Sequence, residues 1–447
     1  MSKNILDTSK NILDLEAKVI GKTGIIRYYP MVISRGDGAR LWDVDGREYI
    51  DFSSGGGVAN IGYNHPLVID AIAAQSKRLT HDCYTVCSND RTPLLASELI
   101  KLLPGDYEKK IWFGLSGSDA CEWVYKMLPK VTGRNKLVSF IGNYQGQTMG
   151  ASALSGLMPQ QSFLSVSNVI HIPYPYCYRC PLNHHPDTCN QECFSYFSEY
   201  LVGTLCDAGD IAAVVLEPIQ GDAGIIIPPA EYLKKLKDFC KEHGIILVVD
   251  EVLSGVGRTG TWWASQQLDI SPDLVVMGKA LGSGVPISAV GGRADLLDAM
   301  TASHHVTCGG NVLACAASLA TLDVIKSEKL LDNAYKMGER LRKGLKQISE
   351  KSKIVGEIRG LGLLTGVEIE QEGLPAQDLA HKVVFAAWQR GLLIYYLGLF
   401  GNTLIACPPL VINQTEIDAG TAILSDAILA VERGEIHDKD IEGFKAW

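Results

Sequence analysis

The sequence predicts an α/β protein with a large domain built on a mostly parallel sheet and a smaller α+β domain. Short apolar runs such as IILVV (245–249) and LVV (274–276) are typical of strands that are buried on both faces. From residue 65 onward such runs alternate with amphipathic segments, which is the pattern of βα units. We assign residues 69–325 to the large domain and residues 1–68 and 326–447 to the small one.

Composition narrows the class of protein. The chain has 447 residues, of which 47% are hydrophobic and 20% charged, as in ordinary globular proteins rather than disordered ones. The net charge of −9 and the lack of a Lys/Arg run argue against nucleic acid or an anionic membrane as a main partner. No apolar run reaches the ~20 residues of a membrane span, and the first 20 residues lack the apolar core of a signal peptide. We therefore expect a cytoplasmic protein without a membrane segment.

Twelve cysteines are present, and most are isolated in apolar or helical surroundings, which is typical of buried thiols. Four are clustered, with two histidines between the pairs: Cys177, Cys180, His184, His185, Cys189 and Cys193. The spacing would suit a zinc site. The three residues between the second pair, in a segment rich in Pro and Asn, favour reduced or locally bridged thiols instead. We expect no metal in the active site.

The N-terminal segment predicts a helix followed by alternating strands in 27–33 and 39–52, with a turn at Asp45-Gly46. The Gly-rich stretch 53–66 follows. It can be a flexible connector or a backbone-lined edge of a pocket, and the sequence does not separate these two interpretations.

Two turns in the next segment could serve a ligand. The Ser-Gly-Ser turn at 116–118 lies directly before a predicted helix, where free backbone amides and the helix dipole can hold a phosphate. Simple N-capping by Ser116 or Ser118 is the plainer explanation. The strand that begins at Lys136 ends near Tyr144, whose ring could stack on a flat cofactor or only pack in the core.

Charged residues follow three of the predicted buried strands. IAAVVL (211–216) leads to Glu217 and, after a short turn, to Asp222, so we expect these carboxylates to face a polar pocket. Asp250 and Lys279 end the next two strands, at the sheet edge where open α/β sheets bind ligands. An acid that can pair with a pyridine nitrogen and a lysine that can bind an aldehyde indicate a pyridoxal 5′-phosphate site.

The remaining segments complete the prediction. VPISAVGG (285–292) predicts an antiparallel edge strand, and Thr307 precedes a Gly-Gly-Asn turn and a helix of small residues. Beyond residue 326 the pattern predicts a long amphipathic helix, strands, a second helix, further strands and a final helix.

Six features occur together in this order: SGSDA (116–120), the strand-end Tyr144, EPIQGDAG (217–224), DEV with GRTG (250–260), the lysine of MGKALGSG (277–284) and T-CGGN (307–311). In this combination, from about Tyr28 to Trp447, the chain resembles the class III aminotransferase family of fold-type I pyridoxal phosphate enzymes. It is most similar to the racemase branch, which acts on amino acids and amino lactams. The resemblance implies the fold-type I architecture and pyridoxal 5′-phosphate as cofactor.

The resemblance also implies roles for individual residues. Lys279 matches the Schiff-base lysine and Asp250 the acid that keeps the pyridine nitrogen protonated. The other cofactor-binding positions are Ser116, Gly117 and Ser118 for the phosphate, Tyr144 and Val252 for the two ring faces, and Glu217 and Thr307. Thr307 matches a threonine that reaches the phosphate of a neighbouring subunit, which implies a homodimer with shared active sites, or a dimer of such dimers.

Departures from the family pattern bear on the reaction. Ile405 stands where family transaminases carry the arginine that binds a substrate carboxylate, Leu253 replaces a usual glutamine, and Gln145 a usual histidine. Asp222 matches an aspartate of the racemase branch, where it would act as the second catalytic acid/base opposite Lys279. Gly56 replaces a tryptophan of the amino-lactam racemases, so the pocket differs from theirs.

We therefore expect a racemase or epimerase of an amino acid, amino amide or lactam. An aminotransferase is the alternative. An ammonia- or phospho-lyase whose loop 54–57 holds an anionic head group is a third. A scaffold without activity is disfavoured because the lysine, the pyridine acid and the phosphate turn are all intact.

Overall fold

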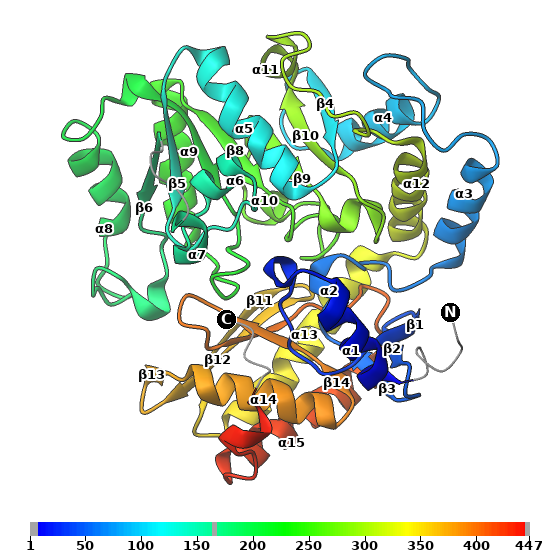
Figure 1. The fold of residues 1–447 in the computed structure, drawn as a ribbon. Coiled ribbons are helices and arrows are strands. Elements are labelled where there is room, and N and C mark those ends of the chain that lie inside the picture. Colours follow the sequence, from blue (N-terminus) through cyan, green and yellow to red (C-terminus); the bar gives the residue numbers. More distant parts are fainter. Residues whose placement is uncertain (1–7, 163–167, 443–447) are drawn as a thin grey trace. The chain divides into compact units, whose positions relative to one another are not determined.

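A computed structural model describes residues 8–162 and 168–442 of the chain (Figure 1). The contacts within it group the residues into two compact units. One contains the segments that end at His65 and begin again at Asp332, and the other runs from Pro66 to Leu331. The predicted domain boundaries, after residues 68 and 325, stay a prediction, because compactness alone does not show that a unit folds independently.

The unit from Pro66 to Leu331 is built on a seven-stranded sheet in the order β4-β10-β9-β8-β7-β5-β6. Its strands are β4 (Lys109–Gly114), β5 (Lys136–Phe140), β6 (Val169–Ile172), β7 (Ile211–Leu216), β8 (Ile246–Asp250), β9 (Leu274–Met277) and β10 (Ser288–Arg293). Strands β5 to β9 pair in parallel, and β10 pairs antiparallel with both β9 and β4. The predicted antiparallel strand is thus present, but its position was wrong: β4 forms the edge, because β10 has hydrogen-bonding partners on both sides.

Helices of this unit are α3 (Pro66–Ser76), α4 (Thr92–Leu102), α5 (Gly117–Thr132), α6 (Met149–Leu154), α7 (Met158–Gln161), α8 (Glu192–Ser195), α9 (Ala230–His243), α10 (Ala264–Gln267), α11 (Ala294–Asp298) and α12 (Val312–Ser327). Every residue of β7, β8 and β9 is buried, as continuous apolar strands require when both faces are covered. The apolar side of α5 packs on this sheet: Val124 and Leu128 share a core cluster with Val215, Val248 and Val276. This packing fixes the N-terminus of α5 relative to the carboxyl ends of the strands.

The other unit contains two smaller sheets, in the orders β1-β2-β3-β14 and β11-β12-β16-β15, with β13 paired to β12. Its elements are α1 (Ser9–Val19), β1 (Ile33–Asp37), β2 (Arg40–Asp43), β3 (Glu48–Asp51), α2 (Ser54–Gly57), α13 (Leu330–Ser349), β11 (Val355–Leu361), β12 (Leu364–Gln371), β13 (Leu374–Pro375), α14 (Gln377–Gln389), β14 (Leu392–Leu393), β15 (Tyr395–Leu397), β16 (Thr403–Ala406) and α15 (Gln414–Glu432). Within the described ranges, no helix is long and apolar enough to cross a membrane.

The Gly-rich stretch 53–66 is held by contacts inside this unit. Its first residues form the short helix α2, in which Gly55 and Gly56 have φ values of 57° and 79° that favour glycine. Ser54 Oγ donates a hydrogen bond of 2.6 Å to the carbonyl of Cys407, and Cys407 Sγ donates one of 3.3 Å to the carbonyl of Ser53. The stretch is therefore anchored at its start rather than a free connector.

The cysteine-rich loop lies in the connection between β6 and β7. The twelve cysteines all lie in the described residues and form no disulfide bond with one another. Cys189 Sγ donates a hydrogen bond of 3.0 Å to Glu192 Oε2. Across residues 8–162 and 168–442, no group of three or more His, Cys, Asp or Glu side chains is arranged to hold a metal ion.

Candidate active site

A pocket lies at the carboxyl ends of the parallel strands. Strands β7, β8 and β9 are neighbours that run in the same direction, so the residues that follow them meet at one edge of the sheet. The pocket is lined by Gly117, Ser118, Tyr144, Gln145, Gly146, Glu217, Asp222, Asp250, Val252, Leu253 and Lys279. All the predicted site residues except Ser116 and Thr307 are brought together here.

Asp250 is the last residue of β8, and its carboxyl is almost completely buried. Oδ1 accepts a 2.9 Å hydrogen bond from the backbone N–H of Val252, and Oδ2 accepts one of 3.4 Å from the thiol of Cys121. Burial raises the pKa of Asp250 although these hydrogen bonds oppose the shift. A carboxylate in such a place gains stability when a cation lies beside it.

The contact between Cys121 and Asp250 could not be predicted from the sequence. Cys121 lies on α5 and reaches Asp250, a residue 129 positions away, so only the packing of α5 on the sheet brings them together. Burial and the nearby Asp250 raise the pKa of the Cys121 thiol well above its usual value, which keeps its proton available for donation.

Glu217 joins two loops that line the pocket. Its Oε1 accepts a 2.7 Å hydrogen bond from the backbone N–H of Tyr144, and its Oε2 accepts one of 2.8 Å from the backbone N–H of Gly221. Burial and the charge of Asp250 raise the pKa of Glu217 well above its usual value. Glu217 thereby fixes the loop that carries the Tyr144 ring relative to the turn that carries Asp222.

The N-terminus of α5 opens into the same pocket. Ser116 is its N-cap, and its hydroxyl accepts a 3.2 Å hydrogen bond from the N–H of Asp119. A Cβ atom on Gly117 would lie 3.1 Å from Val252 Cγ1, so this first residue of the helix has little room for a side chain. The Asp119 side chain turns back and accepts a 2.9 Å hydrogen bond from the N–H of Leu115. An anion can therefore approach the first turn without meeting this carboxylate.

Lys279 and Asp222 complete the reactive part of the pocket. Lys279 follows β9 with a φ of 39°, a left-handed conformation that a non-glycine residue adopts only when its surroundings impose it. Burial raises the pKa of Asp222, and the positive charge of Lys279 partly opposes this shift. The carboxyl and the amine thus act on each other inside one pocket.

The residues present fit pyridoxal 5′-phosphate. The helix start offers backbone amides to a phosphate, Asp250 offers a buried carboxylate to a pyridine nitrogen, and Lys279 offers an amine to an aldehyde. Gln145 also lines the pocket. Its side chain is buried and lies close enough to Asp250 to help lower the pKa of that carboxyl. Neither amide atom makes a hydrogen bond of ordinary geometry in the described parts of the chain, which leaves the amide available to a polar ligand.

Thr307 does not line this pocket. It lies in a second hollow of the same unit, which is also lined by Cys83, Tyr84, Trp112 and His304. Its predicted role toward the phosphate of a neighbouring subunit stays a prediction.

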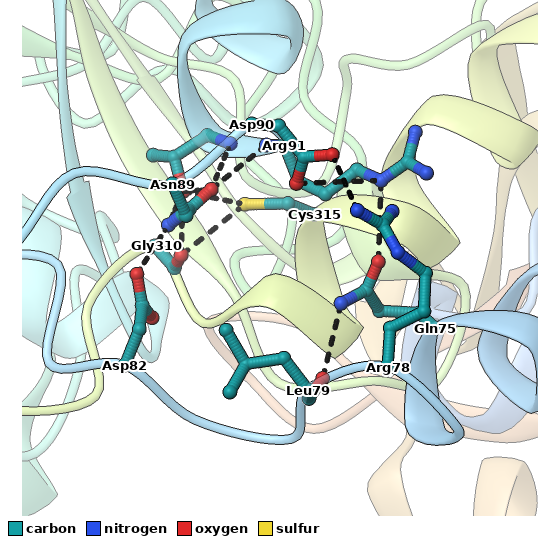
Figure 2. Close-up of polar contacts among 10 residues, drawn as sticks. Gln75, Arg78, Leu79, Asp82, Asn89, Asp90, Arg91, Gly310 and Cys315 are labelled. Atoms are coloured by element: carbon teal, nitrogen blue, oxygen red, sulfur yellow. Dashed lines mark hydrogen bonds and ion pairs between the residues drawn. The ribbon is translucent and has the colours of Figure 1, made fainter.

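A network of polar side chains holds the turn that follows Thr307 (Figure 2). Thr92 Oγ1 donates a 2.8 Å hydrogen bond to the carbonyl of Gly310, and Asn89 Oδ1 accepts a 2.8 Å hydrogen bond from the Thr92 N–H. Asn89 Nδ2 in turn donates a 2.7 Å hydrogen bond to Asp82 Oδ2. The segment 82–92 and the turn before α12 are therefore tied together, and both contribute residues to the lining of the second hollow.

Ile405 lies on β16 in the other unit, where it is completely buried. It pairs across the sheet with Gly366 and Tyr395. The side chain at position 405 is therefore apolar and packed within the sheet.

The chain is similar to known proteins over most of its length. The leucine/methionine racemase of Thermococcus litoralis is 38% identical over 98% of this chain and 99% of its own length. The 5-aminovalerate aminotransferase of Pseudomonas aeruginosa is 36% identical over 90% of this chain and 94% of its own. An amine transaminase from an uncultivated Pseudomonas species, solved with pyridoxal phosphate bound, has a TM-score of 0.83 and 29% identity over 89% of this chain and 94% of its own.

These likenesses confirm the predicted fold class: the protein has the α/β architecture of the fold-type I enzymes, with a largely parallel central sheet. They also confirm the cofactor, which is pyridoxal 5′-phosphate. The pattern of the family described as aminotransferase class-III matches residues 26–428. The chain therefore belongs to the class III aminotransferase family.

Proposed function

We propose that this enzyme is a racemase or epimerase of an amino acid or amino amide, with Lys279 and Asp222 as the two acid/base groups at Cα. One observation carries the proposal: a carboxyl group with a raised pKa lines the same pocket as the lysine and interacts with its charge. Inversion at carbon needs one group to remove the proton and another to return it on the opposite face. Transamination does not require this second group.

The cofactor, when bound, withdraws electrons from the Cα–H bond of an attached amine and so makes its proton removable. The residues of the chain provide the remaining functions. We assign Asp250 to the pyridine nitrogen, Tyr144 and Val252 to the two faces of the ring, and the turn 116–118 to the phosphate. Lys279 removes the proton from one face of Cα in one enantiomer, and Asp222 returns a proton to the other face; the roles reverse for the other enantiomer.

Two further facts favour a racemase. The chain is 38% identical to a leucine/methionine racemase over nearly its whole length. At Ile405, where family transaminases are expected to carry a substrate-binding arginine, the side chain is apolar and buried. A bidentate guanidinium is difficult to replace for a keto-acid substrate.

The second candidate is an aminotransferase, and a specific observation favours it too. A 5-aminovalerate aminotransferase is 36% identical over 90% of the chain, nearly as similar as the racemase. An aminotransferase would return the proton to the cofactor and not to Cα. In that reaction Lys279 alone handles the proton, and Asp222 only shapes the pocket.

We propose a homodimer as the working form. Thr307 is separate from the pocket of its own chain, and the hollow that it lines carries exposed apolar surface nearby, such as Val86 at 77% exposure. A second copy of the chain would cover this surface and present Thr307 to the neighbouring phosphate.

The test is to incubate the holoenzyme in heavy water with leucine, methionine and 5-aminovalerate. Three products are followed: Cα deuterium with inversion, the aminated cofactor, and free ammonia. A racemase inverts one or both amino acids without net amination of the cofactor. Amination of the cofactor with retained chirality would replace the proposal with an aminotransferase, and stoichiometric ammonia would replace it with a lyase.

Asp222→Asn provides the residue-level test. We expect it to slow inversion by about 10²- to 10⁴-fold, the usual contribution of an acid/base group, while cofactor affinity changes little. The matched control is Asp210→Asn, which makes the same change at an exposed position directly before β7. Equal losses of inversion and cofactor binding in Asp222→Asn would remove this residue from the mechanism.

A further inference from the structure

Asp222 is carried by a tight turn between β7 and α9. The backbones of Gln220 and Ile226 exchange two hydrogen bonds of 3.0 Å, which close the turn at its base. The carbonyl of Gly221 accepts hydrogen bonds from the N–H groups of Gly224 at 2.9 Å and Ile225 at 3.2 Å. The position of the Asp222 side chain therefore depends on where the Gly221 backbone lies.

Gly221 is held from two sides. Its N–H donates a 2.8 Å hydrogen bond to Glu217 Oε2. A Cβ atom added to Gly221 would collide with Leu253 Cδ2, so a methyl group of Leu253 lies directly against this backbone. Gly221 is not in a left-handed conformation, so only the available space, and not its φ, restricts the residue at this position.

Leu253 also forms part of the pocket wall. It lies beyond the carboxyl end of β8, is partly buried, and lines the same pocket as Asp222 and Lys279. An apolar wall gives a carboxylate no hydrogen bond and excludes water that would otherwise stabilise its charge.

We propose that Leu253 is a positioning residue for Asp222: its side chain holds the Gly221–Asp222 backbone against Glu217 and keeps the adjacent wall apolar, so that Asp222 can both donate and accept a proton at Cα. This inference rests on the proposed racemase function. Leu253 does not itself take part in proton transfer. A polar side chain in its place would stabilise the charged carboxylate and leave Asp222 a poor proton donor.

The first experiment compares two changes at this position in the holoenzyme. Leu253→Asn replaces the two methyl groups by an amide of nearly the same shape, whereas Leu253→Met keeps an apolar side chain of similar volume. Each enantiomer of an amino acid that the wild type inverts is incubated in heavy water across a range of pH. Deuterium at Cα and inversion are measured separately.

The ratio of exchange to inversion is the decisive quantity. If Asp222 is impaired, the enantiomer whose Cα–H faces Lys279 still exchanges its proton but is seldom inverted. We expect Leu253→Asn to raise this ratio about tenfold or more for that enantiomer, which corresponds to a decrease of about one unit or more in the pKa of Asp222. We also expect the acidic limb of the pH profile of inversion to move to lower pH. The ratio of exchange to inversion in Leu253→Met should stay within about twofold of the wild-type ratio.

A second experiment tests the contact without any reaction. Gly221→Ala should lower the unfolding midpoint of the apoprotein in the wild-type background and lower it much less in a Leu253→Ala background, where space for the methyl group exists. Such non-additivity is the signature of direct contact. If the losses in unfolding midpoint caused by Gly221→Ala and Leu253→Ala are additive, the proposed contact between these residues is refuted.

The outcomes separate the two hypotheses. If the wild type inverts amino acids but Leu253→Asn leaves the ratio unchanged, or slows exchange and inversion in the same proportion, the role of Leu253 is refuted and the racemase function stands. If the wild type inverts no substrate and only aminates its cofactor, the racemase function is refuted, and the role of Leu253 with it.

Discussion

Gly146→Ala tests whether the turn at the start of α5 binds the cofactor phosphate. Gly146 has a φ of 131°, which side-chain-bearing residues rarely adopt, and a Cβ atom there would lie 2.7 Å from both Cα and Cβ of Ser118. The N–H of Gln147 also donates a 3.1 Å hydrogen bond to Ser118 Oγ. The substitution must therefore displace the first turn of α5 or the loop after Tyr144.

The size of the effect follows from these contacts. Moving the Ser118 backbone from 2.7 Å to an ordinary contact of about 3.4 Å requires a shift of about 0.7 Å. The backbone strain alone costs about 1–3 kcal/mol of folding free energy. Misalignment of one N–H that donates to a charged phosphate costs about 2–3 kcal/mol of binding free energy, or about 30- to 150-fold in the dissociation constant.

The assay compares two ligands of the apoprotein by absorbance titration. Pyridoxal 5′-phosphate should lose this affinity in Gly146→Ala, whereas pyridoxal, which lacks the phosphate, should bind almost as it does to the wild type. Gly133→Ala is the matched control, because Gly133 caps the other end of α5 with a φ of 70° and has no atom within 4 Å of an added Cβ. It should lower stability by about 1 kcal/mol without a change in cofactor affinity. An equal loss for both ligands, or an equal loss in the two variants, would refute a phosphate site at this turn.

Two further predictions concern the buried acids. Cys121→Ala removes the thiol that donates a hydrogen bond to Asp250, so the pKa of Asp250 should rise further. The affinity for pyridoxal 5′-phosphate should fall by up to about tenfold, measured by the same absorbance titration. Cys121→Ser keeps a donor at this position and should bind the cofactor almost as the wild type does. Because the pKa values of Asp250 and Glu217 are raised, the native apoprotein keeps protons that the unfolded chain releases above about pH 4. Its free energy of unfolding should therefore fall as the pH rises beyond that point. Urea titrations from about pH 4 upward should show a shallower decline in Asp250→Asn, and an unchanged slope would contradict the assignment.

The parts of the fold that the sequence predicted are those set by local pattern. Continuous apolar strands such as β7 and β8 must be buried on both faces, and a charged residue directly after such a strand must lie at the sheet edge. For this reason Glu217 and Asp250 could be placed beside a pocket before any contact was known. The antiparallel direction of β10 was also predicted, but not its neighbours, because strand order is decided by packing between distant segments.

The contacts that tune the site could not be predicted in the same way. The thiol of Cys121 and the methyl group of Leu253 act on residues that are far away in sequence, and neither side chain differs in type from an ordinary core residue. In the sequence, Leu253 stands out only as a departure from a family pattern. Its contact with Gly221 gives that departure a physical meaning that composition and spacing cannot supply.

The electrostatics of the pocket explain why Asp222 bears on the choice of reaction. A carboxyl group with an ordinary pKa is ionised near neutral pH, so it can accept a proton but has none to donate. Inversion in both directions requires both abilities. Burial raises the pKa of Asp222, whereas the positive charge of Lys279 lowers it. When Lys279 gives up its proton this opposing charge disappears, and the proton affinity of Asp222 increases. The two groups are therefore coupled so that a proton on one disfavours a proton on the other, as a two-base racemase requires.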